Sequence, residues 1–230
     1  MRILNMKQHF GNHLLRKVFY SFLFTVTIFT QFSCTKTIKV YQPPNMDLAQ
    51  YGRLGMMTFT DNAPQSVAQY GTEQFQNQIQ SAQTGIPIVE LGTKQKVLQN
   101  IGSDQLDSEA LQKIGQQFKV SAVFVGDINY SDVKTDVKVE DIVDLKANVN
   151  TTLYATLSVK LYETEGGATI WSNSTAWNRK LGKVSVDKNA GVSVGTSGYD
   201  EAYKKLIPDM VWDVTHDFRG RYVRQRVEKE

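Results

Sequence analysis

The sequence is poor in the side chains that most often carry out chemistry. Its 230 residues include three histidines and one cysteine. His9 and His13 lie in the N-terminal segment, so His216 is the sole histidine beyond that segment. A Cys/His dyad or a His-based metal cluster therefore cannot be assembled from this chain. We expect no catalytic residue, no metal ligand and no cofactor.

The sequence also lacks the motifs of a serine hydrolase and of an EF-hand calcium site. A serine-based triad would have to recruit His216, and the sequence has no G-x-S-x-G nucleophile elbow. Five acidic residues could offer paired carboxylates or calcium ligands, but they lack the spacing and the central glycine of an EF-hand loop. They are Asp132, Asp136, Glu140, Asp141 and Asp144. We interpret them as a solvated strand face, with a hydrolase or metal enzyme as the alternative class.

The chain also lacks a strong excess of either charge. Its formal net charge is +3, from 26 basic and 23 acidic residues. Residues 1–33 hold four of the basic residues and no acidic one, so the rest of the chain is close to neutral. A near-neutral chain does not attract the phosphates of nucleic acids. We therefore expect no nucleic-acid partner.

An uncharged run, Val18–Phe32, follows Arg16 and Lys17 near the N-terminus. Its length of about 15 residues falls short of the roughly 20 needed to cross a bilayer. Such a run suits the apolar region of a signal peptide, preceded by a basic region. We predict that residues 1–33 are a signal peptide, with an uncleaved N-terminal anchor as the alternative.

Cys34 follows this run directly, as a lone cysteine that would otherwise be an unpaired thiol in an oxidising compartment. Gln31-Phe32-Ser33-Cys34 resembles a bacterial lipobox, although Gln31 stands where Leu is usual. The resemblance implies that Cys34 is acylated and anchors the protein to a membrane; the alternative is a plain secretory signal with an incidental cysteine. Thr35 is not the Asp that retains enterobacterial lipoproteins at the inner membrane. This implies an outer-membrane lipoprotein whose domain faces the periplasm.

Beyond the signal, turn residues and hydrophobic periodicity divide the chain into three parts. Residues 34–50 contain Pro43-Pro44, which favours extended structure, and are predicted to be a lipid-proximal tether. Residues 51–222 are predicted to fold as one α/β domain. Residues 223–230 form a charged, largely basic tail, which is either a solvated helix end or a contact to anionic headgroups.

A β-hairpin over Leu153–Ser172 is the strongest local signal in the predicted domain. Apolar residues occupy every second position up to Leu161, and Gly166-Gly167 suit a tight turn. Periodicity predicts further strands at Leu54–Phe59, Ile86–Glu90 and Val120–Ile128, and helices from Val67 to near Gly85, near Val97–Ile101, after Asp107 and from Tyr199. Val120–Ile128 is apolar almost throughout, which is typical of a central strand covered on both faces. Asp107 is predicted to cap the helix that follows it.

Residues 131–152 and 175–198 can form two extended β-hairpins. Between Val133 and Thr151 the odd positions are mostly apolar and the even positions mostly charged. This alternation fits strands that cross a membrane with lipid on one side and water on the other. It also fits hairpins in water that extend the sheet or make a partner surface. The sequence leaves both interpretations open.

Three stretches carry a family resemblance: IPIVE (86–90), DSEALQKIGQQFKVSAVFVGDI (107–128) and LSVKLYETEGGATIWS (157–172). Over about residues 52–220 the chain resembles the CsgG-like envelope lipoproteins, which include the curli secretion channel and the activator lipoproteins of penicillin-binding proteins. Gly126 and the turn leading to Trp171 match the family pattern, whereas Leu91 stands where the family has Arg. The resemblance implies a mixed sheet flanked by helices, no cofactor, and work done by assembly or binding. Pore-forming members add two β-hairpins per subunit.

The expected fold is α/β, with a mixed β-sheet of about five strands flanked by helices and two segments that can extend as β-hairpins. The expected function is that of a lipid-anchored, non-enzymatic envelope protein in assembly, secretion or regulation of envelope machinery. Its expected partners are the membrane, through acylated Cys34, and other envelope proteins. The alternative is a homo-oligomeric outer-membrane export channel formed by two β-hairpins per subunit.

Overall fold

The computed structural model describes residues 36–63, 66–141, 146–186 and 197–227. For Lys36 and for residues 132–141, 146–151, 181–186 and 197–200, only the backbone is described. The chain divides into two compact units. One contains the strands β1 (Lys36–Gln42) and β8 (Arg221–Val227), and the other is the domain Pro43–Gly220.

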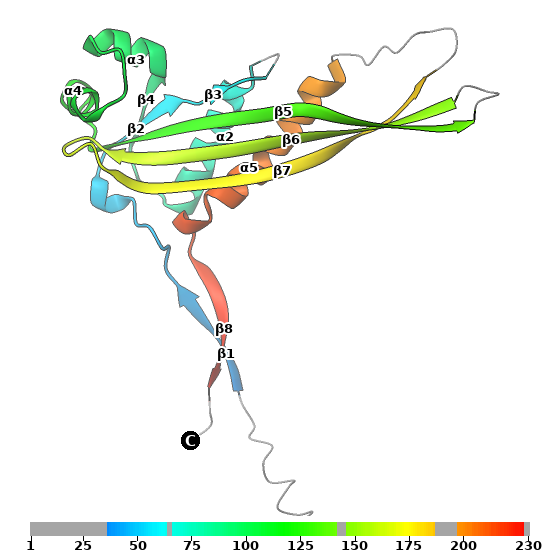
Figure 1. The fold of residues 1–230 in the computed structure, drawn as a ribbon. Helices are drawn as coiled ribbons and strands as arrows, with labels where there is room; N and C mark the ends of the chain where they lie inside the picture. Colours follow the sequence, from blue (N-terminus) through cyan, green and yellow to red (C-terminus); the bar gives the residue numbers. More distant parts are fainter. Residues whose placement is uncertain (1–35, 64–65, 142–145, 187–196, 228–230) are drawn as a thin grey trace, which may run out of the picture. The chain divides into compact units, whose positions relative to one another are not determined.

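A six-stranded mixed sheet forms the centre of the domain, with the strand order β4-β2-β5-β6-β7 and the short β3 paired to β5. The strands are β2 (Leu54–Thr58), β3 (Thr60–Asp61), β4 (Ile88–Thr93), β5 (Ala122–Asp141), β6 (Lys146–Glu163) and β7 (Thr169–Val186). β2 is parallel to β4 and β5, whereas β5, β6 and β7 form an antiparallel meander. The predicted mixed sheet is confirmed (Figure 1).

Helices cover both faces of the sheet where β2 and β5 run. They are α2 (Ala68–Ala82), α3 (Lys94–Ile101), α4 (Ser108–Phe118) and α5 (Ser197–Val214), with short 3-10 turns η1 (Ala49–Tyr51) and η2 (His216–Phe218). Neighbouring residues of β5 enter separate apolar clusters, Phe124 with α2 and α5, and Val123 with α3 and α4. Both side chains are fully buried. The prediction that this strand is covered on both faces is confirmed.

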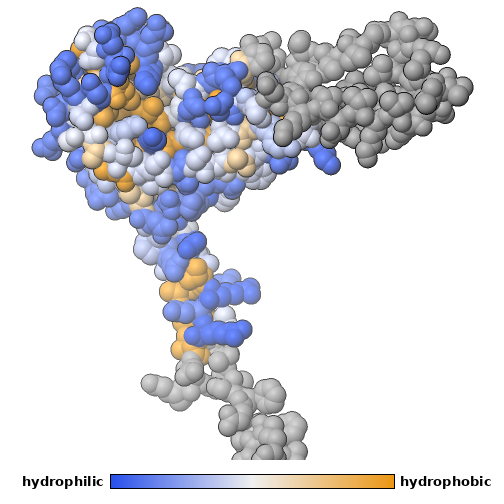
Figure 2. Space-filling view, in the orientation of Figure 1, coloured by the Kyte–Doolittle hydropathy of each residue, from blue (hydrophilic) through white to orange (hydrophobic). Residues whose placement is uncertain are grey.

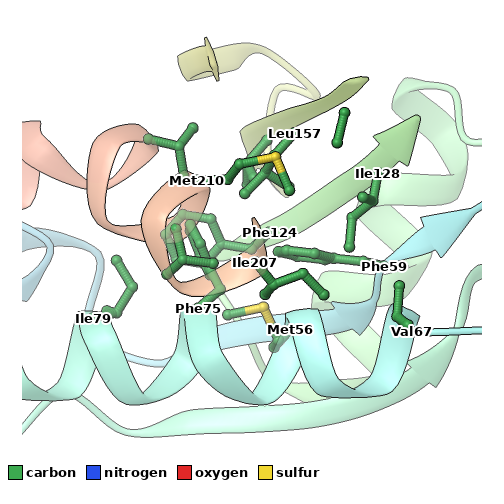
Figure 3. Close-up of a cluster of buried hydrophobic side chains, with 14 of the residues drawn as sticks. Met56, Phe59, Val67, Phe75, Ile79, Phe124, Ile128, Leu157, Ile207 and Met210 are labelled. Carbon is green, nitrogen blue, oxygen red and sulfur yellow. The ribbon is translucent and has the colours of Figure 1, made fainter. Parts of the chain in front are cut away.

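Phe124 lies at the centre of the larger cluster. Its ring centroid is 5.3 Å from that of Phe75, 6.3 Å from Trp171 and 5.9 Å from Phe218, all with edge-to-face geometry. Figure 3 shows Phe75 of α2 and aliphatic side chains of α5 directed at the same point. Helices and strands from both ends of the chain therefore share one core.

Two short-range predictions, the cap at Asp107 and the glycine turn, are confirmed, and a second glycine makes a contact that was not predicted. The Asp107 side chain accepts a hydrogen bond from the Ala110 backbone N–H and caps α4. Gly167 adopts a φ of 71° in the turn between β6 and β7, which glycine tolerates without strain. Gly126 lies against the Phe59 ring, and a Cβ atom there would be 2.4 Å from a ring carbon.

The predicted tether is partly incorporated into the domain. Leu48 is fully buried, and its backbone N–H donates to Gln83 Oε1 at 2.8 Å. Gln83 Nε2 in turn donates to the carbonyls of Met46 and Phe218. The Gln83 side chain therefore connects the first residues of the domain to its last ones. The domain begins at Pro43 instead of the predicted residue 51.

The predicted helical end of the basic tail is wrong. Residues 223–227 of the tail belong to β8, which pairs antiparallel with β1 from Gln42↔Arg221 to Lys36↔Val227, and residues 228–230 lie outside the described residues. In β8, Tyr222, Arg224 and Arg226 lie on one face, whereas Val223 and Val227 lie on the other. The charge pattern of the tail does not reveal this strand, because its partner lies near the other end of the chain.

The two segments predicted to extend as hairpins, 131–152 and 175–198, differ in their secondary structure. β5 and β6 pair as far as Asp141↔Lys146, so the described part of the first segment is an antiparallel strand pair. In the second segment β7 pairs with β6 up to Val186↔Ala147, and α5 begins at Ser197. Residues 187–196 lie outside the described residues.

Candidate assembly surface

The structure leaves the predicted lipidation site untested, because Cys34 lies outside the described residues. Of the five acidic residues considered as ligands, Asp144 is also outside them. The backbones of the other four run along β5, and their side chains are not described. Within the described residues, no three His, Cys, Asp or Glu side chains gather closely enough to hold a metal ion.

His216 is the first residue of η2, and both of its ring nitrogens lie near polar groups. Its Nδ1 lies 2.9 Å from the Asp213 carbonyl and 3.3 Å from Asn173 Nδ2, and its Nε2 lies 3.2 Å from Asp217 Oδ1. None of these groups is a hydroxyl or thiol. The geometry is that of a histidine that helps to close the C-terminal turn.

A polar hollow of about 730 Å³ opens beside α4 and the β6–β7 turn. Gln112 and Gln116 of α4 line one side, and Glu163 and Glu165 line another. The Gln112 amide donates to the Glu165 carbonyl at 3.0 Å, so part of this wall is already hydrogen-bonded. Among its lining residues no nucleophile is paired with a base, so the hollow offers polar contacts without a catalytic arrangement.

Two tryptophans fasten β7 to the C-terminal helical segment. Trp177 Nε1 donates to Asp213 Oδ2 at 2.7 Å, and Trp171 Nε1 donates to Asp217 Oδ2 at 3.1 Å. Asp217 Oδ1 also accepts from Asn45 Nδ2 at 2.9 Å. Hydrogen bonds to ionised acceptors are stronger than neutral ones. The two indole–carboxylate bonds therefore fix the face of β7 against α5 and η2.

The Asp217 carboxylate makes the stability of the domain depend on pH. Burial acts to raise its pKa, but hydrogen bonds from Asn45 and Trp171, together with His216, lower it below the ordinary value. The folded state therefore binds fewer protons at this site than the unfolded state, whose Asp pKa is about 3.9. This contribution to stability is complete well above that pKa and is lost as the pH falls through the lower, folded value.

We expect the stability difference between the wild type and Asp217→Asn to shrink as the pH falls from neutral to about 3. Protonation removes the charge from Asp217 at low pH, so the substitution then changes less. Urea unfolding at several pH values measures the difference. Trp171→Phe removes one donor to the carboxylate and should change the pH dependence in the same direction. A difference that stays constant with pH would contradict the assignment.

β5, β6 and β7 continue together beyond the core as an arm, made of β5 after Ser131, β6 before Thr152 and β7 after Lys180 (Figure 1). The register of all three strands shifts at the base of the arm, between Ser131 and Lys134 and between Asn150 and Thr152. Bulges of this kind bend and twist strands and often mark functional positions. The edge-to-face contact of Tyr130 and Tyr203, with centroids 4.3 Å apart, fixes the base to α5.

β7 is a long strand at the edge of the sheet. It spans 18 residues, against six in β4 at the other edge, and among the described residues no strand pairs with its outer side. Natural proteins usually shorten, charge or cover such edges, because unpaired N–H and C=O groups can bind another strand. From Ser172 to Asn178 the strand carries no charged residue. The outer side of β7 therefore has the properties of an assembly surface.

The geometry defines a class: an α/β domain with a mixed sheet, a three-stranded arm and a long β7 edge. Among the described helices, none is long and apolar enough to cross a membrane. No protein-family model and no curated protein matches the chain.

The chain is similar at low identity to several solved structures, bacterial lipoproteins among them. The PelC dodecamer from Paraburkholderia phytofirmans is 12% identical with a TM-score of 0.41, covering 81% of this chain and 99% of that one. Lipoprotein GNA1162 from Neisseria meningitidis is 15% identical with a TM-score of 0.33, covering 69% and 96%. The LpoB C-terminal domain from Escherichia coli is 16% identical with a TM-score of 0.32, covering 55% and 82%.

Proposed function

We propose that this protein is a non-enzymatic lipoprotein of the bacterial outer membrane, anchored through acylated Cys34 with its domain in the periplasm. It acts in assembly, secretion or regulation of envelope machinery by binding other proteins. The observation that carries this proposal is the 18-residue edge of β7 together with the arm. An added strand gains main-chain hydrogen bonds along such an edge, and side-chain contacts then select the partner.

The second candidate is a homo-oligomeric export channel to which each subunit contributes its arm and residues 175–198. The pairing of β5 and β6, which extends past two register shifts to Asp141↔Lys146, favours it, because a strand pair that extends beyond the core is the required element. The two candidates differ in what lies against β7: another envelope protein in the first, and a copy of this chain in the second.

Photo-crosslinking in intact cells tests the proposal. A photo-reactive residue at Ala176, which is exposed in the middle of β7, should give a crosslinked product. The same residue at Gln95, which is exposed on α3, serves as the matched control and should give several-fold less. Asn178→Lys, added to the chain with the photo-reactive residue at position 176, should lower the yield of crosslinked product. The reason is that a charged edge discourages strand addition.

The identity of the crosslinked product separates the two candidates. A different envelope protein supports the lipoprotein that acts through protein contacts, whereas a product at a multiple of this chain's own mass supports the channel. Equal products from Ala176 and Gln95 would show that the β7 edge is not the binding surface.

A further inference from the structure

The β1–β8 unit is a two-stranded antiparallel ribbon, a structure that is marginally stable in water by itself. Successive side chains of each strand point to opposite faces, and paired residues share a face. One face carries the aliphatic residues Ile38, Val40, Val223 and Val227, together with Gln42 and Arg221 at one end, Lys36 at the other and Gln225 between. Figure 2 shows apolar and strongly hydrophilic atoms side by side along this ribbon. Its two faces therefore differ in chemistry.

The opposite face is basic and aromatic. Tyr41 and Tyr222 are paired across the strands with ring centroids 5.3 Å apart, and they are 55% and 73% exposed. Lys39, Arg224 and Arg226 lie on the same face, and all three are exposed. We name this set of five residues the basic face.

The charges of the ribbon are of one sign. β1 contributes Lys36 and Lys39, β8 contributes three arginines, and neither strand contains an acidic residue. Lys39 is the direct cross-strand partner of Arg224. Like charges in directly opposite positions destabilise a strand pair. An anion bound between them would remove this repulsion, so the pairing itself points to an anionic ligand.

We propose that the basic face binds the anionic headgroups of a phospholipid membrane. Phosphate groups would neutralise Lys39, Arg224 and Arg226, and the two tyrosines would lie at the headgroup level, where amphipathic rings are favoured. The proposal rests on the proposed function in one respect: the lipid anchor at Cys34 places the ribbon at a membrane. Cys34 lies two residues before β1, so its lipid would hold the ribbon within about 7 Å of the anchor.

A second copy of the ribbon is a poor occupant of this face. Two ribbons, each with basic residues and no acidic ones, repel each other when their basic faces meet. A membrane surface with anionic lipids offers the opposite charge over a wide area, and one acyl chain gives only marginal binding without a second signal. The basic face would supply that second signal.

Vesicle sedimentation tests the proposal with the chain from Cys34 to Glu230, prepared without an acyl group. We expect it to bind vesicles of phosphatidylcholine mixed with phosphatidylglycerol, and to bind phosphatidylcholine alone much more weakly. Lys39→Gln/Arg224→Gln/Arg226→Gln should reduce binding to the mixed vesicles on the order of 100-fold, because each cation near an anionic surface contributes about fivefold. Added salt should weaken the binding of the wild type.

Two control variants separate a charge effect from loss of structure. Lys96→Gln/Lys160→Gln/Lys204→Gln removes three exposed charges from the domain and should leave binding close to the wild type. Lys39→Arg/Arg224→Lys/Arg226→Lys keeps the charge of the basic face and should also bind. In a Tyr222→Trp chain, the indole fluorescence should shift further to the blue with mixed vesicles than that of the wild type, whose three tryptophans provide the baseline, and the difference reports the ribbon.

Equal binding to both kinds of vesicle, or unchanged binding by the triple glutamine variant, would overturn the proposal. So would a ribbon-dependent change of oligomeric state without vesicle binding, which would identify a second copy as the occupant. Since the chain tested carries no acyl group, its result is independent of whether Cys34 is lipidated. Failure here is thus distinguishable from failure of the proposed anchor.

Discussion

A Cys34→Ala chain is expected to lose all incorporation of a fatty-acid analogue in growing cells. Cys34 is the sole cysteine, so no other thiol can accept the lipid. Without an acyl group the protein loses the apolar surface that holds it in the bilayer, where each buried CH₂ contributes about 0.8 kcal/mol. The chain should therefore also move out of the outer-membrane fraction when cell membranes are separated by density.

Ser33→Ala provides the matched control for this experiment. It keeps a small residue before the cysteine, so labelling and membrane fractionation should stay as in the wild type. Equal labelling of the wild type and Cys34→Ala would end the lipoprotein interpretation. The proposed binding of proteins along β7 would then have to occur without a lipid anchor.

Phe124→Ala is expected to lower the free energy of unfolding by about 3–5 kcal/mol, the range for removing a large side chain from a packed core. The ring contacts Phe75 of α2, Trp171 of β7 and Phe218 of η2, so its loss leaves a cavity bordered by three elements that are far apart in the sequence. A domain of ordinary stability has about 5–15 kcal/mol in total. Denaturation with urea, followed by tryptophan fluorescence, measures the change.

Tyr222→Ala is the matched aromatic control, because that ring is 73% exposed in the ribbon. We expect it to change the free energy of unfolding by no more than about 0.5 kcal/mol. A loss of similar size in both variants would contradict the central position of Phe124. Such a result would mean that aromatic area, irrespective of burial, sets the stability.

Elements specified by neighbouring residues were predictable from the sequence. The alternation from Leu153 to Leu161 predicted β6, the apolar run from Val120 to Ile128 predicted a doubly covered strand, and Asp107 predicted the start of α4. In each case the signal and the structure lie within one stretch of chain, where periodicity of 2.0 or 3.6 residues determines which side chains share a face.

Contacts between distant residues were not predictable. Trp177 and Asp213 are 36 positions apart, Trp171 and Asp217 are 46 apart, and no local periodicity identifies such partners. The pairing of β1 with β8 was missed for the same reason. Of the candidate assembly surface, the sequence predicted the long strands but not that β7 would be the edge, because strand order is a property of the assembled sheet.

The amide of Gln83 and the Asn45–Asp217 bond have a consequence for the order of folding. In the unfolded chain β1 and β8 would have to close a loop of nearly 180 residues, at an entropic cost of about 4–5 kcal/mol. The seven residue pairs of the exposed β1–β8 ribbon do not offset that cost by themselves. Once the domain has folded, it holds residues 45–46 next to residues 217–218, so the entropic cost of closing the loop no longer opposes the pairing of β1 with β8. The ribbon should therefore form last during folding, and its pairing depends on a domain that has already folded.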